Sequence, residues 1–256
     1  GDLNISAGSI SLSNSARIAG GGLTHVSATG LVSNLGKLTS AGDLTVTANT
    51  LNNHGTLGSA ENLRLVAPTL LNEYGLIFSG EDMTLRVDNF TNKFADVYSL
   101  GGIDLARNDQ GANASLLDNL SGTLESTGEF SLKAAVINNV RAALVVNNAG
   151  KYTAKITELA CSGYYGAGDC SGKRNGVWEI IERDKLEVTQ ASAASSIQAG
   201  GNLLLTGDTL TNSSSLIGAG GNITANLTRL ENTGVETGEI ETRRIFTSER
   251  TRNIGS

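Results

Sequence analysis

Residues 42–75 read GDLTVTANTLNNHGTLGSAENLRLVAPTLLNEYG and contain the same two elements twice. The first element is a turn followed by alternating apolar residues, as in GDLTV (42–46) and ENLRL (61–65). The second element carries an asparagine and ends in glycine, as in LNNHG (51–55) and LLNEYG (70–75). A repeat of about 20 residues made of such short runs is typical of a solenoid, in which each repeat forms one coil.

The first element recurs along most of the chain. Its first apolar position falls at Leu3, Leu23, Leu44, Leu63, Met83, Ile103, Phe130, Leu203 and Ile223. Turn-forming residues separate the runs, which is the period-two pattern of short strands, and no segment sustains the apolar spacing of a helix. Such short strands bury an apolar face only when successive coils stack on one another. We therefore predict an all-β fold, a right-handed parallel β-helix.

The second element contributes a column of its own. Its asparagine falls at Asn34, Asn53, Asn72, Asn92, Asn119, Asn212 and Asn232. Asparagine tolerates the left-handed turn conformation, and stacked side-chain amides can hydrogen-bond from one coil to the next. We predict that these residues form a structural asparagine ladder.

Composition narrows the classes of partner. The 256 residues carry a net charge of −6, which does not favour binding to the phosphates of nucleic acid. We therefore expect no nucleic-acid partner. No apolar run is long enough to cross a membrane as a helix, so we also expect no membrane-spanning segment. The first residues also lack the basic and apolar regions of an export signal, so we interpret the chain as a piece of a longer protein.

Catalytic, metal and cofactor sites have little support in the sequence. Neither histidine has a nucleophile motif nearby, and the glycine-rich turns lack the spacing of a phosphate-binding loop. Asp104, Asp109 and Asp118 lie around a longer step between repeats but lack the spacing of a calcium loop, so 106–115 is expected to be a solvated loop. We predict no catalytic residue, no metal site and no cofactor.

Interruptions of the repeat divide the chain into four parts. We expect β-helix coils over 1–156 and 191–235, an extra-helical insertion over 157–190, and an exit or capping segment over 236–256. NAGKYTAKI (148–156) is interpreted as one further coil. The alternation in VWEIIERDKLEVT (177–189) predicts a β-hairpin that leaves the β-helix.

The insertion has a composition unlike that of the coils. Cys161 and Cys170 lie nine residues apart in a glycine-rich stretch, which fits a local disulfide in an exported protein better than a metal site. Aromatic and basic residues also gather here, namely Tyr164, Tyr165, Lys173, Arg174 and Trp178. Tyrosine, tryptophan and arginine are enriched at binding hot spots, so these five are candidate partner contacts. The alternative is that the aromatic side chains only cover the exposed end of the hairpin.

The two registered elements, L-x-N-x-G and then a turn with an alternating strand, resemble the repeats of filamentous haemagglutinin and of the contact-dependent growth-inhibition (CdiA-like) effectors. The resemblance covers most of residues 1–146 and 191–235. It implies a two-partner-secreted exoprotein that uses an outer-membrane transporter partner and stays on the outer surface of a Gram-negative cell. It also implies a stalk that presents a region binding a target-cell receptor or glycan and, in the effectors, delivers a C-terminal toxin.

Two other functions are compatible with the sequence. One is an adhesin that binds host glycan or matrix and delivers no toxin. The other is a polysaccharide-cleaving β-helix enzyme, which would need carboxylates that converge on adjacent coils. We expect a structural and binding role, without enzymatic activity.

Overall fold

The computed structural model describes residues 1–162 and 175–248, and its elements are strands joined by turns. The chain divides into two compact units. The coil unit comprises residues 1–143 and 192–234, and the three-stranded unit comprises residues 144–191 and 235–256. In the described ranges, no helix has the length and hydropathy needed to cross a membrane.

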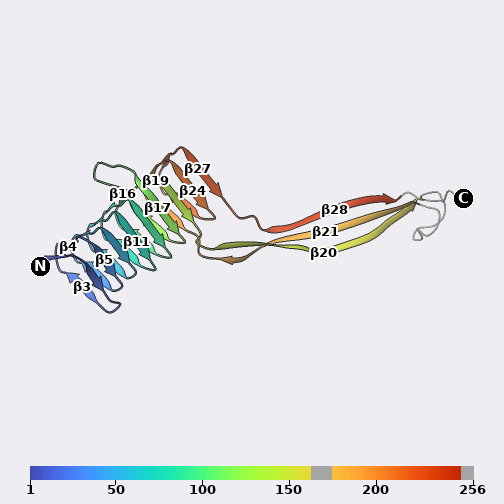
Figure 1. Cartoon of the computed structure of the whole chain (residues 1–256). Helices are drawn as coiled ribbons and strands as arrows, with labels where there is room; N and C mark the ends of the chain where they lie inside the picture. The colour runs from blue at the N-terminus through green and yellow to red at the C-terminus, as the bar shows by residue number, and fades with distance from the viewer. Residues whose placement is uncertain (163–174, 249–256) are drawn as a thin grey trace. The chain divides into compact units, whose positions relative to one another are not determined.

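The coil unit is built from three faces of parallel strands (Figure 1). Face A holds β1 (Leu3–Ala7), β4 (Thr24–Ala28), β7 (Leu44–Thr47), β10 (Leu63–Val66), β13 (Met83–Arg86), β16 (Ile103–Ala106), the first part of β19 (Phe130–Val140), β23 (Leu203–Thr206) and β26 (Ile223–Asn226). Face B holds β2 (Ile10–Leu12), β5 (Leu31–Asn34), β8 (Thr50–Asn53), β11 (Thr69–Glu73), β14 (Asn89–Lys93), β17 (Ala114–Leu120), the second part of β19, β24 (Thr209–Ser213) and β27 (Arg229–Thr233). Face C holds β3 (Arg17–Gly20), β6 (Lys37–Ser40), β9 (Thr56–Ser59), β12 (Leu76–Ser79), β15 (Asp96–Ser99), β18 (Thr123–Ser126), β22 (Ser196–Ala199) and β25 (Leu216–Ala219). The predicted parallel β-helix is confirmed.

Stacked apolar side chains fill the interior of the coil unit. Leu44, Leu63 and Met83 follow one another in register on face A, and each is almost completely buried. Side chains alternate between the two sides of a strand, so each strand sends about half of its residues inward and half to solvent. The interior is therefore continuous from coil to coil, and no single coil has a core of its own.

The structure corrects one position of the predicted apolar column. Leu23 is 58% exposed, and Thr24 takes the place in register between Leu3 and Leu44. The first step of the repeat is thus one residue longer than predicted, and a shift of one residue moves a side chain to the opposite side of a strand. Thr24 is buried, and its hydroxyl donates a hydrogen bond to Ser40 Oγ at 2.9 Å.

The asparagines of face B form a continuous ladder of side-chain hydrogen bonds. Each Nδ2 donates to the Oδ1 of the asparagine in the next coil, at 2.7 to 2.9 Å, through Asn34, Asn53, Asn72, Asn92, Asn119, Asn139, Asn212 and Asn232. Asn139 belongs to this column, although the sequence repeat did not place it there. The Nδ2 groups also donate to backbone carbonyls of the turns, as Asn92 does to Ala95 O at 2.9 Å. The ladder therefore pairs amides that would otherwise be buried without partners.

The coil continues across the excursion of the chain through 144–191. Ser192 N donates to Ala143 O at 2.8 Å, so the chain leaves the coil unit and returns to it at the same point. Arg141 holds this point by donating to Ser192 O at 2.7 Å and to Ser214 O at 2.8 Å. Asn139 Nδ2 then donates to Asn212 Oδ1 at 2.7 Å, a distance like those between the other ladder asparagines. The insertion therefore interrupts the sequence of the β-helix but not its stacking.

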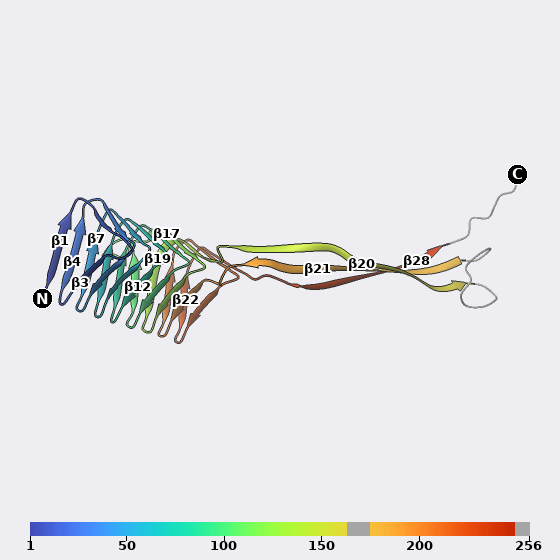
Figure 2. The same ribbon diagram turned by 90° about the horizontal axis from the view of Figure 1, so that it is seen from below.

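The three-stranded unit is an antiparallel sheet, and the predicted extra-helical hairpin is confirmed (Figure 2). It consists of β20 (Leu144–Ser162), β21 (Asn175–Ala191) and β28 (Gly238–Ser248), with β21 between the other two. The predicted continuation of the coils to 156, with 148–156 as one further coil, is wrong, because β20 starts at Leu144. The NAG stretch at 148–150 is a register irregularity between Asn148 and Lys151 in the pairing with β21, not a turn of a coil.

The segment after the last coil follows one of its two predicted alternatives. Residues 236–256 were expected to leave or cap the coil, and Gly238–Ser248 leaves it as a strand that pairs with β21 over its whole length. Opposite charges meet across this pairing, at Glu179 with Arg243 and at Arg183 with Glu241. Cross-strand pairs of opposite charge favour one strand partner and one register. The charges that suggested a polar cap thus serve strand pairing.

Replacing a ladder asparagine should destabilise the coil unit far more than replacing its neighbour. Asn53→Ala removes the acceptor of one Asn34 Nδ2 hydrogen bond and the donor to the buried Asn72 Oδ1, and should lower the free energy of unfolding by roughly 2–4 kcal/mol. Asn52→Ala changes the same residue type on the outer side of the same strand and should cost less than about 0.5 kcal/mol. Urea unfolding followed by circular dichroism measures both. Equal losses would contradict a stabilising ladder.

Candidate functional site

The acidic side chains of the coil unit that could bind calcium lie around the longer step of the repeat. Among the described residues, no group of three or more His, Cys, Asp or Glu side chains is placed to hold a metal ion. The aspartates considered for calcium instead contact arginines or an amide. Asp104 and Asp109 bind arginine, and Asp118 accepts a hydrogen bond from Asn138 at 2.7 Å.

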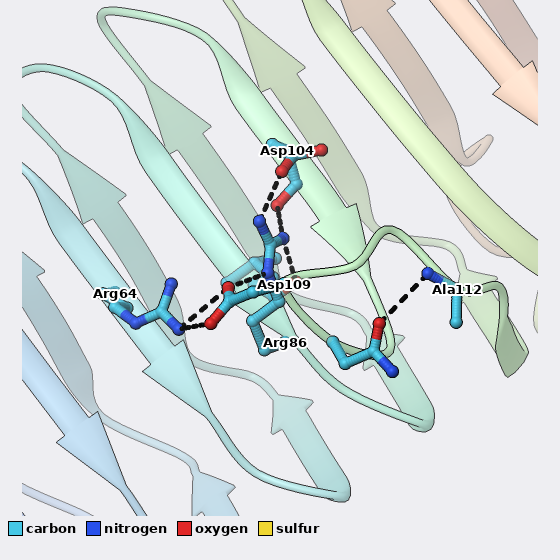
Figure 3. Close-up of polar contacts among 7 residues, drawn as sticks. Arg64, Arg86, Asp104, Asp109 and Ala112 are labelled. Carbon is cyan, nitrogen blue, oxygen red and sulfur yellow. Dashed lines mark hydrogen bonds and ion pairs between the residues drawn. The ribbon is translucent and has the colours of Figure 1, made fainter.

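The longer step between Ile103 and Phe130 forms a loop that folds back over face A (Figure 3). Arg64 Nη2 donates to both carboxylate oxygens of Asp109, at 2.8 and 3.0 Å, and Arg86 Nε donates to Asp109 Oδ1 at 2.8 Å. Arg86 also donates to Asp104 Oδ2 at 2.6 Å. These four residues, the Asp109 ion-pair cluster, come from three successive coils and the loop. The loop is solvent-exposed, as expected, but it is attached to the coils.

The electrostatics of the Asp109 ion-pair cluster follow from these contacts. The hydrogen bond from Arg86, and next that from Arg64, lowers the pKa of the Asp109 carboxyl below its ordinary value. Within the loop, Ala112 N donates to Asn108 Oδ1 at 3.1 Å and closes the turn. All the acidic groups here are paired with arginine, so the arrangement holds the loop and leaves no free carboxylate for acid–base chemistry.

The three-stranded unit exposes apolar and aromatic side chains. Trp178 in β21 lies opposite Phe246 in β28, and neighbouring residues in register share one face of a sheet. Phe246 is 48% exposed, and Ile156 is exposed on the same face, opposite Ile180. We define this set of four residues as the Trp178 face. Exposed apolar area of this kind is typical of surfaces that bind a partner.

The opposite face of this sheet is more strongly charged. It carries Glu179, Arg183 and Arg243, and the Arg243 guanidinium contacts the Glu179 carboxylate. Glu179 is 6% exposed, so its charge is compensated where water is largely excluded. Ile245 lies on this face as an isolated exposed apolar residue. The two faces therefore differ in chemistry, and among the side chains that the structure describes only those of the Trp178 face bring aromatic rings together.

The structure places one of the five candidate contact residues. Trp178 is half-buried in β21, whereas Tyr164, Tyr165, Lys173 and Arg174 lie outside the described residues. Cys161 belongs to β20, but Cys170 lies outside the described residues, so the disulfide stays a prediction.

Phe246 was missed because its segment was assigned to the coil end. A signal for it is present in the sequence. VWEIIER (177–183) and ETRRIFT (241–247) carry complementary charges when aligned antiparallel, which places Phe246 opposite Trp178.

Removing the charge of Asp109 should free the loop. Asp109→Asn loses both arginine ion pairs, so trypsin should cleave after Arg107 roughly two to five times faster than in the unchanged chain. Asp208→Asn provides a matched control, because Asp208 is an exposed aspartate elsewhere on the coil unit. Cleavage rates that do not differ between the two variants would show that the cluster does not hold the loop.

The attachment of the loop should also depend on pH in one direction. The pKa of Asp109 is lowered in the folded chain, so its contribution is fully present above the ordinary carboxyl pKa and is lost as pH falls through the lowered value. Carbon NMR titration of the side-chain carboxyl measures this pKa. Arg86→Gln should raise it, and an unchanged pKa would contradict the assigned cause.

Comparison with known proteins agrees with this architecture. The family model of the haemagglutinin repeat matches residues 1–93, 59–114, 101–155 and 185–238. The chain is 27% identical over 159 residues to "Deoxyribonuclease CdiA" of Dickeya dadantii (strain 3937).

That alignment covers 62% of this chain and 4% of the relative, so the chain spans a small part of the relative's length. No solved structure matches the chain. The resemblance inferred from the two registered elements is confirmed, since the family model covers most of the chain. The chain belongs to the haemagglutinin-repeat family.

Proposed function

We propose that this chain is a stalk segment of a two-partner-secreted exoprotein, and that its three-stranded unit meets the surface of a target cell. The observation that carries the proposal is the continuity of the coil across the excursion, from Asn139 to Asn212. In a stalk, the coils before and after an attached binding element must still stack on each other, because no coil is stable alone. An insertion that leaves and returns at hydrogen-bonded residues, Ala143 and Ser192, meets that need.

The Trp178 face is the proposed contact surface. It combines large aromatic and apolar side chains, which contribute most of the binding energy at protein interfaces. Tyr164, Tyr165, Lys173 and Arg174 are proposed to extend the surface, and a Cys161–Cys170 disulfide is proposed to hold their segment together. The partner class is a target-cell receptor or glycan.

The proposed location is the outer surface of a Gram-negative bacterium, reached with the help of an outer-membrane transporter partner. The haemagglutinin-repeat match and the relative named CdiA support this proposal. The deoxyribonuclease activity in the relative's name belongs to that protein, and we propose a structural and binding role for this chain. An adhesin that carries no toxin stays the alternative, since the coil would serve both proteins in the same way.

Binding of the full 256-residue chain to a panel of Gram-negative outer-membrane vesicles tests the proposal. Trp178→Ser and Phe246→Ser should each lower the bound fraction at least about tenfold, because hot-spot aromatics dominate interface energy. Ile245→Ser is the matched control, since it removes the neighbouring exposed apolar residue from the opposite face.

Circular dichroism separates lost contact from lost structure. The proposal requires that the two aromatic variants keep the spectrum and melting of the unchanged chain. It fails if they bind vesicles as well as Ile245→Ser does, or if their binding is lost only together with the folded sheet.

A further inference from the structure

Aromatic residues are unevenly distributed over the coil unit. It contains six of them, and Phe90 and Phe130 are buried in the interior. The other four point outward and all belong to two successive coils, namely Tyr74, Phe78, Phe94 and Tyr98. Solvent-facing positions of a coil need no aromatic side chain for stacking, so this concentration points to a local role.

The outward residues of β12 and β15 line a hollow of about 770 Å³ on face C, which we define as the face C hollow. Phe78 and Tyr98 lie side by side in register and form its aromatic wall. Phe78 lies over Gly58 of the preceding coil, where an added Cβ would come within 2.1 Å of the ring. A glycine in a strand interior permits such close approach, so the backbone accommodates this ring. Leu76 and Leu100 add further apolar surface.

Two carboxylates also line the face C hollow. Asp96 is exposed and Glu125 is half-buried, and both precede buried residues in their strands. Within the described part of the chain, neither carboxylate has a hydrogen-bond or ion-pair partner, unlike the Asp109 carboxylate. None of the described residues that line the hollow is basic. The hollow therefore offers unused acceptors beside an apolar wall.

The adjoining corner of the same two coils keeps two more aromatic rings outside. Tyr74 and Phe94 stack with their ring centroids 5.4 Å apart and their planes at 12°. Both have positive φ angles, 55° and 48°, and Ser121 and Ser214 have the same conformation at the equivalent turn of other coils, so the backbone geometry belongs to the repeat. Tyr74 is 68% exposed. These two coils thus carry outward aromatic rings at a turn where two other coils carry serine.

We propose that the face C hollow binds a neutral saccharide chain. A pyranose ring has a face of C–H groups that packs on an aromatic ring, and a rim of hydroxyl groups that need acceptors. Phe78 and Tyr98 supply the aromatic wall, and the Asp96 and Glu125 carboxylates accept the hydroxyl hydrogens. This site lies in the coil unit and goes beyond the proposed contact of the three-stranded unit.

Charge decides against acidic occupants of the face C hollow. Two carboxylates without a basic partner repel sulfated or sialylated glycans and phosphate groups. An apolar protein surface, including a second copy of this chain, would bury both carboxylates unpaired, which is costly. A neutral saccharide satisfies them with its hydroxyl groups and also covers the aromatic wall, and tighter binding of a basic peptide such as hexalysine would overturn the proposal.

Calorimetric titration of the full chain with cellohexaose, chitohexaose and mannohexaose tests the proposal, with a heparin hexasaccharide as the acidic comparison. At least one neutral hexasaccharide should bind, and Tyr98→Ser should weaken it about tenfold. Tyr98→Phe keeps the ring and should lose only about threefold, and Asp96→Asn should also weaken binding. Leu23→Ser and Asp208→Asn are matched controls on other coils and should leave the affinity unchanged.

Several outcomes would overturn the proposal. These are no binding of any neutral hexasaccharide, equal or tighter binding of the heparin hexasaccharide, and equal affinity of Tyr98→Ser and the unchanged chain. A dimer in analytical ultracentrifugation that Tyr98→Ser dissociates would assign the hollow to self-association instead. Vesicle binding through the Trp178 face does not depend on these residues, so failure of either proposal is distinguishable from failure of the other.

Discussion

Stacking of side chains in register from coil to coil is the constraint on which the rest of this structure depends. A strand of four residues has no stable partner within its own coil, so Leu44 is buried only because Leu63 lies in register beside it. The asparagine ladder fixes that register, since a slip of one residue would turn the amides to the outside, away from the backbone carbonyls to which they donate. Everything attached to the coil must therefore leave and return without moving it.

The outer side of the coils is free of that constraint, and the distinctive chemistry of the chain lies there. The loop around Asp109 is held by arginines that point away from the interior. Phe78 and Tyr98 occupy outward positions that other coils fill with Thr39 or Gln198. The interior can therefore stay uniform while single coils acquire separate surface properties.

The sequence predicts the coils well because the apolar column and the asparagine column repeat with the same period, and only one stacking of the coils aligns both columns. It fails at Leu23, where the step changes by one residue, and at Asn139, whose coil is separated from the next by the insertion. It also misplaces the start of β20 and the partner of β28. Period-two alternation is the same in a parallel coil and in an antiparallel sheet, and only non-local pairing distinguishes them. Phe78 and Tyr98, likewise, become neighbours only once the register is known.

The three strands of the three-stranded unit come from both sides of the coils over 192–234 in the sequence. A two-stranded hairpin is marginally stable in water, and β20 with β21 is such a hairpin until a third strand arrives. That strand, β28, follows the last coil in the sequence, and its Arg243 compensates the buried charge of Glu179. In the sequence, the coils over 192–234 separate the hairpin from its third strand. The sheet that carries the Trp178 face is therefore complete only when the chain on both sides of those coils is present.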